Sequence, residues 1–272
     1  MTVQIIPLTP KIGSEIQIDL ATLLSGEQAP LIRATLEQRG VVVFRDLHID
    51  DEQQFAIAST LGSPLKEGGG KDGVYKVSLD ASINAKADYL RGANYWHVDG
   101  STQDKPYYGT LLRPITIARE GGQTEFCNTY AAYEDLPQED KDAIEDLRVV
   151  HSMERSLWFI YPEPSYAQIQ AWQQVPNKSC PLVWKQKSGR RSLLLGATAD
   201  YVEGLSVEES RALLVRLREW ATRPEYVYRH EWSPGDLVIW NNTGTMHRAI
   251  AYPADSGRLM IRTTLAGEEV LS

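Results

Sequence analysis

The sequence predicts a mainly β-sheet protein, built around a barrel with flanking helices. From Tyr107 onward, short runs of β-branched and aromatic residues alternate with turn residues, whereas the clearest helical patterns lie outside these runs. The chain has 272 residues, 42% of them hydrophobic, which is enough to bury one sizeable core. All-β barrels of this length commonly form one domain, so we expect residues 1–272 to be a single domain.

The N-terminal part predicts two helices around one buried strand. Residues 27–38 carry apolar side chains at helical spacing, and Gly40 follows as a left-handed helix end. The β-branched run Val41–Phe44 is typical of a buried strand. Asp50 is placed as the N-cap of a second helix, which Gly62 ends.

In the middle of the chain the sequence predicts strands, interrupted by one amphipathic helix and one long segment without periodicity. We expect strands at Tyr108–Leu112 and Gln123–Phe126, and an amphipathic helix outside the sheet within residues 132–147. Residues 154–179 are the least periodic segment and hold several aromatic residues between prolines. Long loops of this kind act as lids or binding loops, and the alternative is an aromatic loop packed on the barrel.

The C-terminal part predicts one long helix and two strands. Ser206 and Glu209 form a capping box that opens a helix over Val207–Ala221. The turn Trp232–Asp236 then leads into a strand at Leu237–Trp240. The glycine-rich stretch 66–73 lacks the spacing of a phosphate-binding loop, so we expect a flexible loop there.

Charge and composition argue against several classes of protein. The formal net charge is -8, the wrong sign for a chain that grips nucleic acid or anionic membranes. The sequence holds no long apolar run and no basic leader, so we expect a cytoplasmic protein. Cys127 and Cys180 are its two cysteines, without zinc-type clustering, and a structural disulfide between them is not expected.

His97 and Asp99 form an H-x-D pair, and His247 lies far downstream. Residues i and i+2 of a strand share one face, so both side chains can point into a barrel. Two imidazoles and one carboxylate leave part of a metal's coordination sphere open, as in non-haem Fe(II) oxygenases. The pair His48 and Asp50 has the same spacing, but helix capping explains that aspartate better.

Arg258 and Arg262 lie on the same face of a strand predicted at residues 258–265. If that face is buried, the guanidinium groups require anionic partners, because an unpaired buried charge is very costly. A dicarboxylate co-substrate and an anionic substrate would satisfy this requirement.

The chain resembles the taurine/2,4-dichlorophenoxyacetate dioxygenase family of Fe(II)/2-oxoglutarate oxygenases over nearly its whole length. The resemblance rests on the blocks Trp96–Asp99, Gly121–Thr124, Trp232–Asp236 with Trp240, and His247–Ala249 followed by Arg258 and Arg262. It implies a double-stranded β-helix (jelly-roll or cupin-like) core. It also implies that His97, Asp99 and His247 bind iron, that Thr124 and Arg258 hold the distal carboxylate of 2-oxoglutarate, and that Arg262 lies near the carboxylate or substrate pocket.

The resemblance also implies the chemistry. Such enzymes use O₂ to convert 2-oxoglutarate to succinate and CO₂ and hydroxylate a C–H bond of a small molecule, in some cases with cleavage or desaturation. Related halogenating enzymes have a small residue where this chain has Asp99, so halogenation is not expected. Trp240 could lie near the iron, although packing is the commoner role of a buried indole. Asn241-Asn242 replaces an Asp-Asn pair found in relatives, and we expect this to alter hydrogen bonding around the ligands.

The substrate is less well defined by the sequence. Arg262 with Lys66, Lys71 or Lys105 could hold a small anionic substrate, whereas Asn94 and Tyr95 with nearby aromatics could line a pocket for a larger apolar or aromatic one. The aromatics concerned are Tyr107, Tyr108 and Trp158. A noncatalytic ligand-binding barrel and a zinc hydrolase are the alternatives to an oxygenase, although the H-E-x-x-H motif is absent. The sequence leaves a homo-oligomer open.

Overall fold

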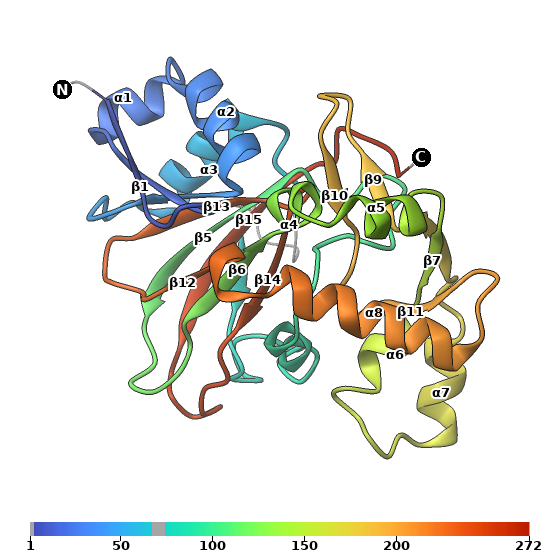
Figure 1. The fold of residues 1–272 in the computed structure, drawn as a ribbon. Helices are drawn as coiled ribbons and strands as arrows, with labels where there is room; N and C mark the ends of the chain where they lie inside the picture. The colour runs from blue at the N-terminus through green and yellow to red at the C-terminus, as the bar shows by residue number, and fades with distance from the viewer. Residues whose placement is uncertain (1–2, 67–73, 272) are drawn as a thin grey trace.

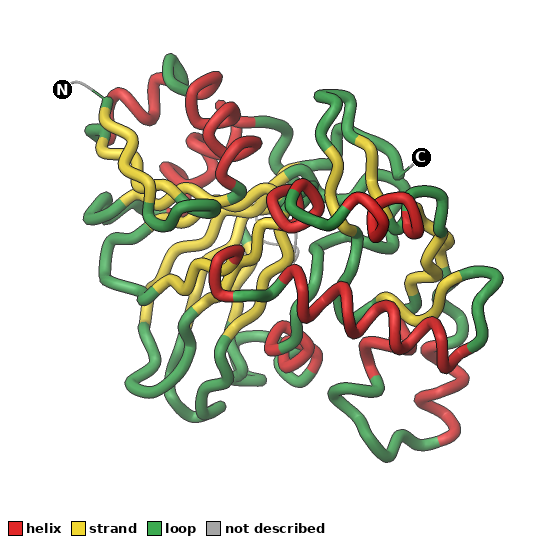
Figure 2. Tube along the Cα trace, in the orientation of Figure 1, coloured by secondary structure: helices red, strands yellow, loops and turns green. Residues whose placement is uncertain are grey.

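The structure is a computed structural model that describes residues 3–66 and 74–271. The glycine-rich stretch, apart from Lys66, lies outside the described residues, and so does Lys71. Within the described part, strands occupy the centre and helices gather at the flanks, as Figure 2 shows. The predicted combination of β-sheet and flanking helices is therefore confirmed.

The larger sheet combines strands from both ends of the chain. In the described part of the chain it has seven strands in the order β1-β2-β3-β13-β5-β15-β4. The strands are β1 (Gln4–Pro7), β2 (Ser14–Gln17), β3 (Val41–Phe44), β4 (Tyr75–Val77), β5 (Gly109–Thr116), β13 (Leu237–Asn241) and β15 (Leu259–Leu265). All four residues of β3 are buried, as its run of β-branched residues predicts. The strands predicted at the N- and C-terminal ends thus lie side by side.

A smaller sheet faces the larger one (Figure 1). Its order is β12-β6-β14, from β12 (Val227–His230), β6 (Thr124–Asn128) and β14 (Thr245–Ala249). One buried cluster joins side chains of both sheets, including Phe126 of β6, Trp240 of β13 and Met260 of β15. The two sheets therefore enclose a common interior, and this interior holds the candidate site.

Three helices cover the outer face of the larger sheet (Figure 1). They are α1 (Leu20–Ser25), α2 (Ala29–Arg39) and α3 (Asp51–Leu61). Gly40 ends α2 with a positive φ of 74°, and Asp50 caps α3 in a capping box with Gln53, as predicted. Leu36 and Ile57 pack with Phe44 and Ile239 of the sheet. This layer seals the outer side of the sheet.

A second helical layer lies beside the smaller sheet. The predicted helix within residues 132–147 is wrong as one element: the chain forms α4 (Thr129–Glu134) and α5 (Gln138–Ile144), separated at Pro137, which cannot continue a helix. The predicted helix α8 (Val207–Ala221) is confirmed, with its capping box and buried Leu214 and Leu217. Short strands complete this part: β7 (Arg148–His151), β8 (Lys178–Pro181), β9 (Val183–Lys185), β10 (Arg191–Leu193) and β11 (Ala199–Val202).

Residues 154–179 are more ordered than their sequence pattern predicts. They contain most of α6 (Met153–Leu157) and all of α7 (Tyr166–Trp172), which pack through Trp158 and Trp172. Two short 3-10 helices, η1 (Tyr89–Asn94) and η2 (Pro224–Tyr226), complete the described elements. No helix in the described residues is long and apolar enough to span a membrane.

Candidate metal centre

Backbone pairing brings the H-x-D motif to the second histidine. His97 and His247 form an isolated antiparallel bridge, and each backbone N–H donates to the carbonyl of the other, at 3.0 and 2.9 Å. The prediction that His97 and Asp99 lie on a regular strand is wrong. Asp99 belongs instead to a turn that continues at Gly100, whose φ is 77°. The two side chains nevertheless reach the same point.

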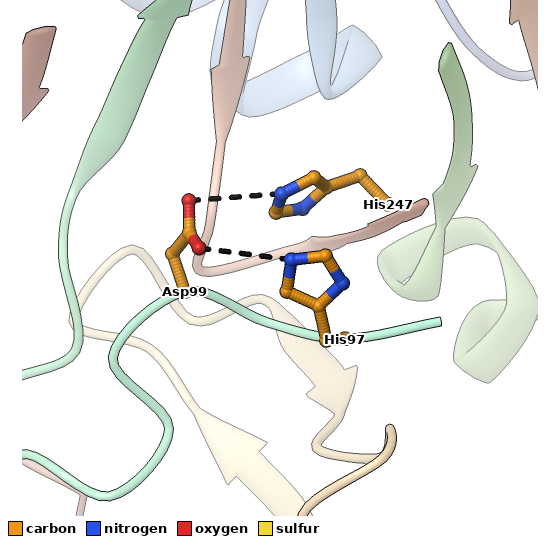
Figure 3. Close-up of side chains that lie close together, drawn as sticks. All are labelled: His97, Asp99 and His247. Atoms are coloured by element: carbon orange, nitrogen blue, oxygen red, sulfur yellow. Dashed lines mark ion pairs between the residues drawn. The ribbon is translucent and has the colours of Figure 1, made fainter. Parts of the chain in front are cut away.

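Three ligand atoms converge on one position (Figure 3). Asp99 faces both histidines from one side: its Oδ1 is 3.8 Å from Nε2 of His97, and its Oδ2 is 3.6 Å from Nε2 of His247. The three ligand atoms lie within 4.8 Å of one another. The other ring nitrogen of His97, Nδ1, lies 2.8 Å from the Tyr95 carbonyl, which leaves Nε2 free to act as the ligand. This donor set fits a divalent transition metal.

The charge states of these groups also suit a metal. Burial lowers the pKa of His247 to about 3, so this imidazole is neutral at physiological pH. Burial would raise the pKa of Asp99, but nearby positive charge, first that of His247 and then that of Arg262, holds it below its usual value. At pH 7 His247 is neutral, so the positive charge that then acts on Asp99 is that of Arg262. A carboxylate is thus available to the metal.

A chain of hydrogen bonds supports Asp99 from the far side. The hydroxyl of Thr110, on β5, donates to Asp99 Oδ2 at 3.1 Å. Asn242 then donates from its Nδ2 to the Thr110 hydroxyl at 3.1 Å and accepts from Trp240 Nε1 at 3.0 Å. All three supporting residues are buried. Asn242, which matches the second residue of the relatives' Asp-Asn pair, thus supports Asp99 through Thr110. Asn241, the position that departs from that pair, caps the adjacent turn through Thr243 instead.

Trp240 lies close to the candidate metal position. Its ring centroid is 4.7 Å from that of His247, and its side chain is buried between the two sheets. Packing against a ligand is thus an observed role of this indole.

Arg258 is a buried cation with no carboxylate partner in the described part of the chain. Its Nη2 donates to the Gly122 carbonyl at 3.0 Å, and its guanidinium stacks 4.6 Å from the centre of the Tyr252 ring. A Cβ at Gly122 would come within 3.0 Å of Arg258 Nε, so glycine leaves the room that the guanidinium occupies. Burial lowers the pKa of Arg258 without neutralising it at pH 7. A buried, charged guanidinium requires an anionic partner to offset the cost of its burial.

Thr124 begins β6 on the same interior side. Its position is fixed by pairing with Ala249 of β14, two residues along the sheet from the Phe126–His247 pair. The Thr124 hydroxyl accepts a hydrogen bond from Trp232 Nε1 at 3.1 Å. Thr124 and Phe126 are two residues apart on one strand, so their side chains point to the same face of the sheet.

Arg262 lies on β15 within electrostatic range of the ligands. It contributes to the lowered pKa of Asp99 and stacks over the ring of Tyr75 at 4.8 Å. Tyr89 of η1 interacts electrostatically with both Asp99 and Arg262. Sequence reasoning missed Tyr75 and Tyr89, because isolated tyrosines in irregular segments carry no periodic signal. Asn94 ends η1 and is half-buried beside the metal motif.

Tyr95 lies beside a cavity that is separate from the three candidate ligands. It lines a cavity of 650 Å³ with Phe159 and Trp96, and none of His97, Asp99 and His247 lines that cavity. Tyr95 stacks on Phe159 at 4.6 Å and donates a hydrogen bond to the Phe159 carbonyl at 3.2 Å. It therefore connects the metal motif to the segment after α6.

The remaining histidines, Tyr108 and Trp158 lie apart from this centre, whereas Tyr107 contacts Gly100 next to Asp99. His48 pairs with Asp46 at the surface, and His151 and His230 are buried in the core with hydrogen-bond partners, as predicted. Tyr108 stacks against Arg33 beside another surface cavity. Trp158 packs on Trp172.

The fold and the three converging ligands define a class of metal-dependent oxygenase in which two histidines and one carboxylate leave coordination positions open. The chain belongs to the taurine catabolism dioxygenase TauD, TfdA family, whose model matches residues 4–264. It is an Fe(II)-dependent dioxygenase that uses 2-oxoglutarate and O₂, and the family resemblance seen in the sequence is confirmed.

Individual relatives agree with this assignment. The chain is 34% identical to the alpha-ketoglutarate-dependent 2,4-dichlorophenoxyacetate dioxygenase of Cupriavidus pinatubonensis, with 100% of both chains covered. It is 31% identical to the alpha-ketoglutarate-dependent sulfate ester dioxygenase of Pseudomonas putida, covering 96% of this chain and 89% of the relative. The crystal structure of AAD-2 with Mn(II) and N-oxalylglycine superposes with a TM-score of 0.85 at 33% identity, covering 100% of both chains.

Proposed function

We propose that His97, Asp99 and His247 bind the Fe(II) of this dioxygenase. The convergence of their three ligand atoms within 4.8 Å supports this assignment most directly. When bound, the metal supplies the site at which O₂ and 2-oxoglutarate react. The chain's own contribution is to present one carboxylate and two imidazoles and to leave the remaining positions open.

Thr124 and Arg258 are the proposed partners of the distal carboxylate of 2-oxoglutarate. The supporting observation is that Arg258 is buried without a carboxylate among residues 3–66 and 74–271. A guanidinium can hold a carboxylate with two parallel hydrogen bonds. Thr124 lies two residues along β6 from the pairing partner of His247, which is a separation of about 7 Å. A five-carbon dicarboxylate is long enough to span a separation of this order.

We propose that the organic substrate is small and anionic, and that Arg262 attracts its charged group. Arg262, on β15, acts electrostatically on Asp99, so a substrate held there would lie beside the proposed metal position. The relatives named for 2,4-dichlorophenoxyacetate and for sulfate esters both act on anions. Lys66, Lys105, Asn94 and Tyr95 remain predicted substrate contacts. Hydroxylation of the substrate, alone or followed by cleavage, is the proposed outcome.

The architecture is proposed to be a double-stranded β-helix within one domain spanning residues 1–272. The two facing sheets with a shared interior support this topology. Residues 154–179 are proposed as a lid, because the Tyr95–Phe159 contact joins them to the metal motif. The expected cytoplasmic location and a homo-oligomeric state stay predictions of the sequence.

The test of the metal assignment is anaerobic difference spectroscopy. Fe(II) and 2-oxoglutarate added to the metal-free protein should give a weak visible charge-transfer band that His97→Ala abolishes. Replacing His48, a surface histidine, with alanine provides the matched control and should leave the band unchanged. A band of undiminished intensity in His97→Ala would contradict the assignment.

The substrate class is tested by succinate release under air. Aryloxyacetates and alkyl sulfates are compared with neutral amide or alcohol analogues of the same size. Release that depends on the anionic group, and that Arg262→Gln weakens for the anions alone, is the expected result. Equal turnover of the neutral analogues would favour the larger apolar or aromatic class of substrate.

A further inference from the structure

The indole N–H of Trp232 contacts the hydroxyl of Thr124. Its Nε1 lies 3.1 Å from the Thr124 hydroxyl oxygen. An indole N–H can donate but cannot accept, whereas a hydroxyl has one proton to donate and two lone pairs. The direction of this bond is therefore fixed: Trp232 donates and Thr124 accepts. In the described residues no other hydrogen bond of the Thr124 side chain is found, so its own proton remains available.

The indole of Trp232 is itself held by a buried network. Its ring meets that of His230 edge to face, with centroids 4.4 Å apart and an interplanar angle of 79°. His230 is fixed at both ring nitrogens, by the Tyr228 hydroxyl at 2.9 Å and by Asp236 at 3.0 Å. His230 and Asp236 are 0% and 1% exposed. The indole therefore has little freedom to turn its N–H elsewhere.

Asp236 is anchored in turn by the residues around it. Its Oδ2 accepts from the backbone N–H of Ser233 at 2.8 Å and from Arg45 at 2.7 Å. These bonds hold the turn Trp232–Asp236 in one conformation, in which the indole N–H points toward Thr124. A tight turn forms with suitable backbone angles alone. The buried Asp236, His230 and Tyr228 are therefore not required to form this turn, and they instead fix the orientation of the indole.

We propose that Trp232 is a positioning residue for co-substrate binding, which orients the Thr124 hydroxyl so that its proton points to the distal carboxylate of 2-oxoglutarate. This inference rests on the proposed role of Thr124. Without Trp232, the hydroxyl could rotate and use its proton elsewhere, for example on a backbone carbonyl. With Trp232 in place, the hydroxyl is already oriented before 2-oxoglutarate arrives, which lowers the cost of ordering it.

The test is a double-mutant cycle on binding rather than on turnover. Protein loaded with Mn(II) is titrated with 2-oxoglutarate by calorimetry, so that no reaction occurs. A hydrogen bond to a charged group contributes about 1.5–3 kcal/mol, so Thr124→Val should weaken binding roughly 10- to 100-fold. Trp232→Phe keeps the ring and removes the N–H, and it should weaken binding about 3- to 10-fold.

The cycle separates orientation from packing. In a Thr124→Val background, Trp232→Phe should cause no further loss. In a Thr124→Ser background, which retains the hydroxyl, the loss should reappear. Trp220→Phe is the matched control, because Trp220 Nε1 donates to the Ala132 carbonyl far from the centre, and it should leave the affinity unchanged. Circular dichroism and thermal unfolding check that every variant is folded.

Each contrary outcome has a distinct meaning. If Trp232→Phe weakens binding equally in the wild-type and Thr124→Val backgrounds, the indole acts by packing and the inference is overturned. If Thr124→Val weakens binding but Trp232→Phe does not, the inference fails while the proposed co-substrate site stands. If Thr124→Val leaves the affinity unchanged, the proposed co-substrate site and this inference both fail.

Discussion

Replacing Thr110 with valine removes one hydroxyl from the support of Asp99 at nearly constant side-chain volume. The Thr110 hydroxyl donates to Asp99 Oδ2 and accepts from Asn242 Nδ2, both at 3.1 Å. The change therefore leaves the carboxylate less restrained and the buried amide of Asn242 without its acceptor. One substitution should disturb both metal affinity and stability, for two separate reasons.

The expected magnitudes follow from these two bonds. Loss of a group that hydrogen-bonds a metal ligand typically lowers metal affinity about 10- to 100-fold. A buried donor left without an acceptor costs about 1–3 kcal/mol of stability. Thr110→Val/Asn242→Leu should recover neither the metal affinity nor much of the stability, because it removes the unsatisfied amide but leaves the buried Trp240 Nε1 without its acceptor. Thr110→Ser should retain most of both.

The assay is a competition titration of Fe(II) or Mn(II) against a chelator, with urea unfolding measured on the metal-free protein. Thr263→Val is the matched control, because Thr263 also accepts from a buried amide, that of Gln54 at 3.1 Å, but points away from the centre. It should lower stability and leave metal affinity unchanged. The reasoning is refuted if Thr110→Val binds metal as tightly as the wild type, or if Thr263→Val weakens metal binding equally.

Three further predictions concern other parts of the molecule. Arg258→Lys keeps the charge but loses the paired donors, so calorimetry should show 2-oxoglutarate binding weakened about tenfold or more. Burial lowers the pKa of His151 to about 4 from 6.5, so the unfolded chain gains a proton in this window that the folded chain does not. Unfolding free energy should therefore fall by about 2 kcal/mol from this group between pH 6.5 and 5, and His151→Leu should flatten the slope measured in urea. Tyr95→Ala removes the stacking and hydrogen bond to Phe159, so limited proteolysis should cut residues 154–179 faster than in the wild type.

Each of these has a contrary result. Arg258→Lys with wild-type affinity would place the co-substrate carboxylate elsewhere. A pH slope unchanged in His151→Leu, with His48→Gln as the surface control, would mean that His151 takes up its proton in the folded state. Proteolysis at an unchanged rate in Tyr95→Ala would show that residues 154–179 are held by other contacts.

Local signals in the sequence predicted the elements that depend on neighbours in the chain. Gly40 and the Asp50 and Ser206 caps mark helix ends because the backbone groups they satisfy lie within a few residues. The run Val41–Phe44 is apolar on both faces because it lies within a sheet covered on both sides. The candidate metal ligands were predicted from the short H-x-D motif and from the family pattern that includes His247 far downstream.

Features that depend on strand register could not be predicted. Thr110 reaches Asp99, and Asn242 reaches Thr110, because β5 and β13 pair with one particular alignment. The residues next to a threonine or an asparagine in the sequence do not reveal its hydrogen-bond partner in the fold. The expected strand at His97–Asp99 was wrong for a related reason: the chain makes a single bridge there and then turns.

The order of strands in the larger sheet has a consequence for how the enzyme acquires its iron. β13 lies between β3 and β5, and β15 lies between β5 and β4, so strands made early flank strands made last. His97 meets His247 through backbone bonds that cannot form until both segments are present. A ribosome must therefore release almost the whole chain before the three ligands can meet. A chain truncated before β14 would lack His247 and keep only two of the three residues proposed to bind the metal.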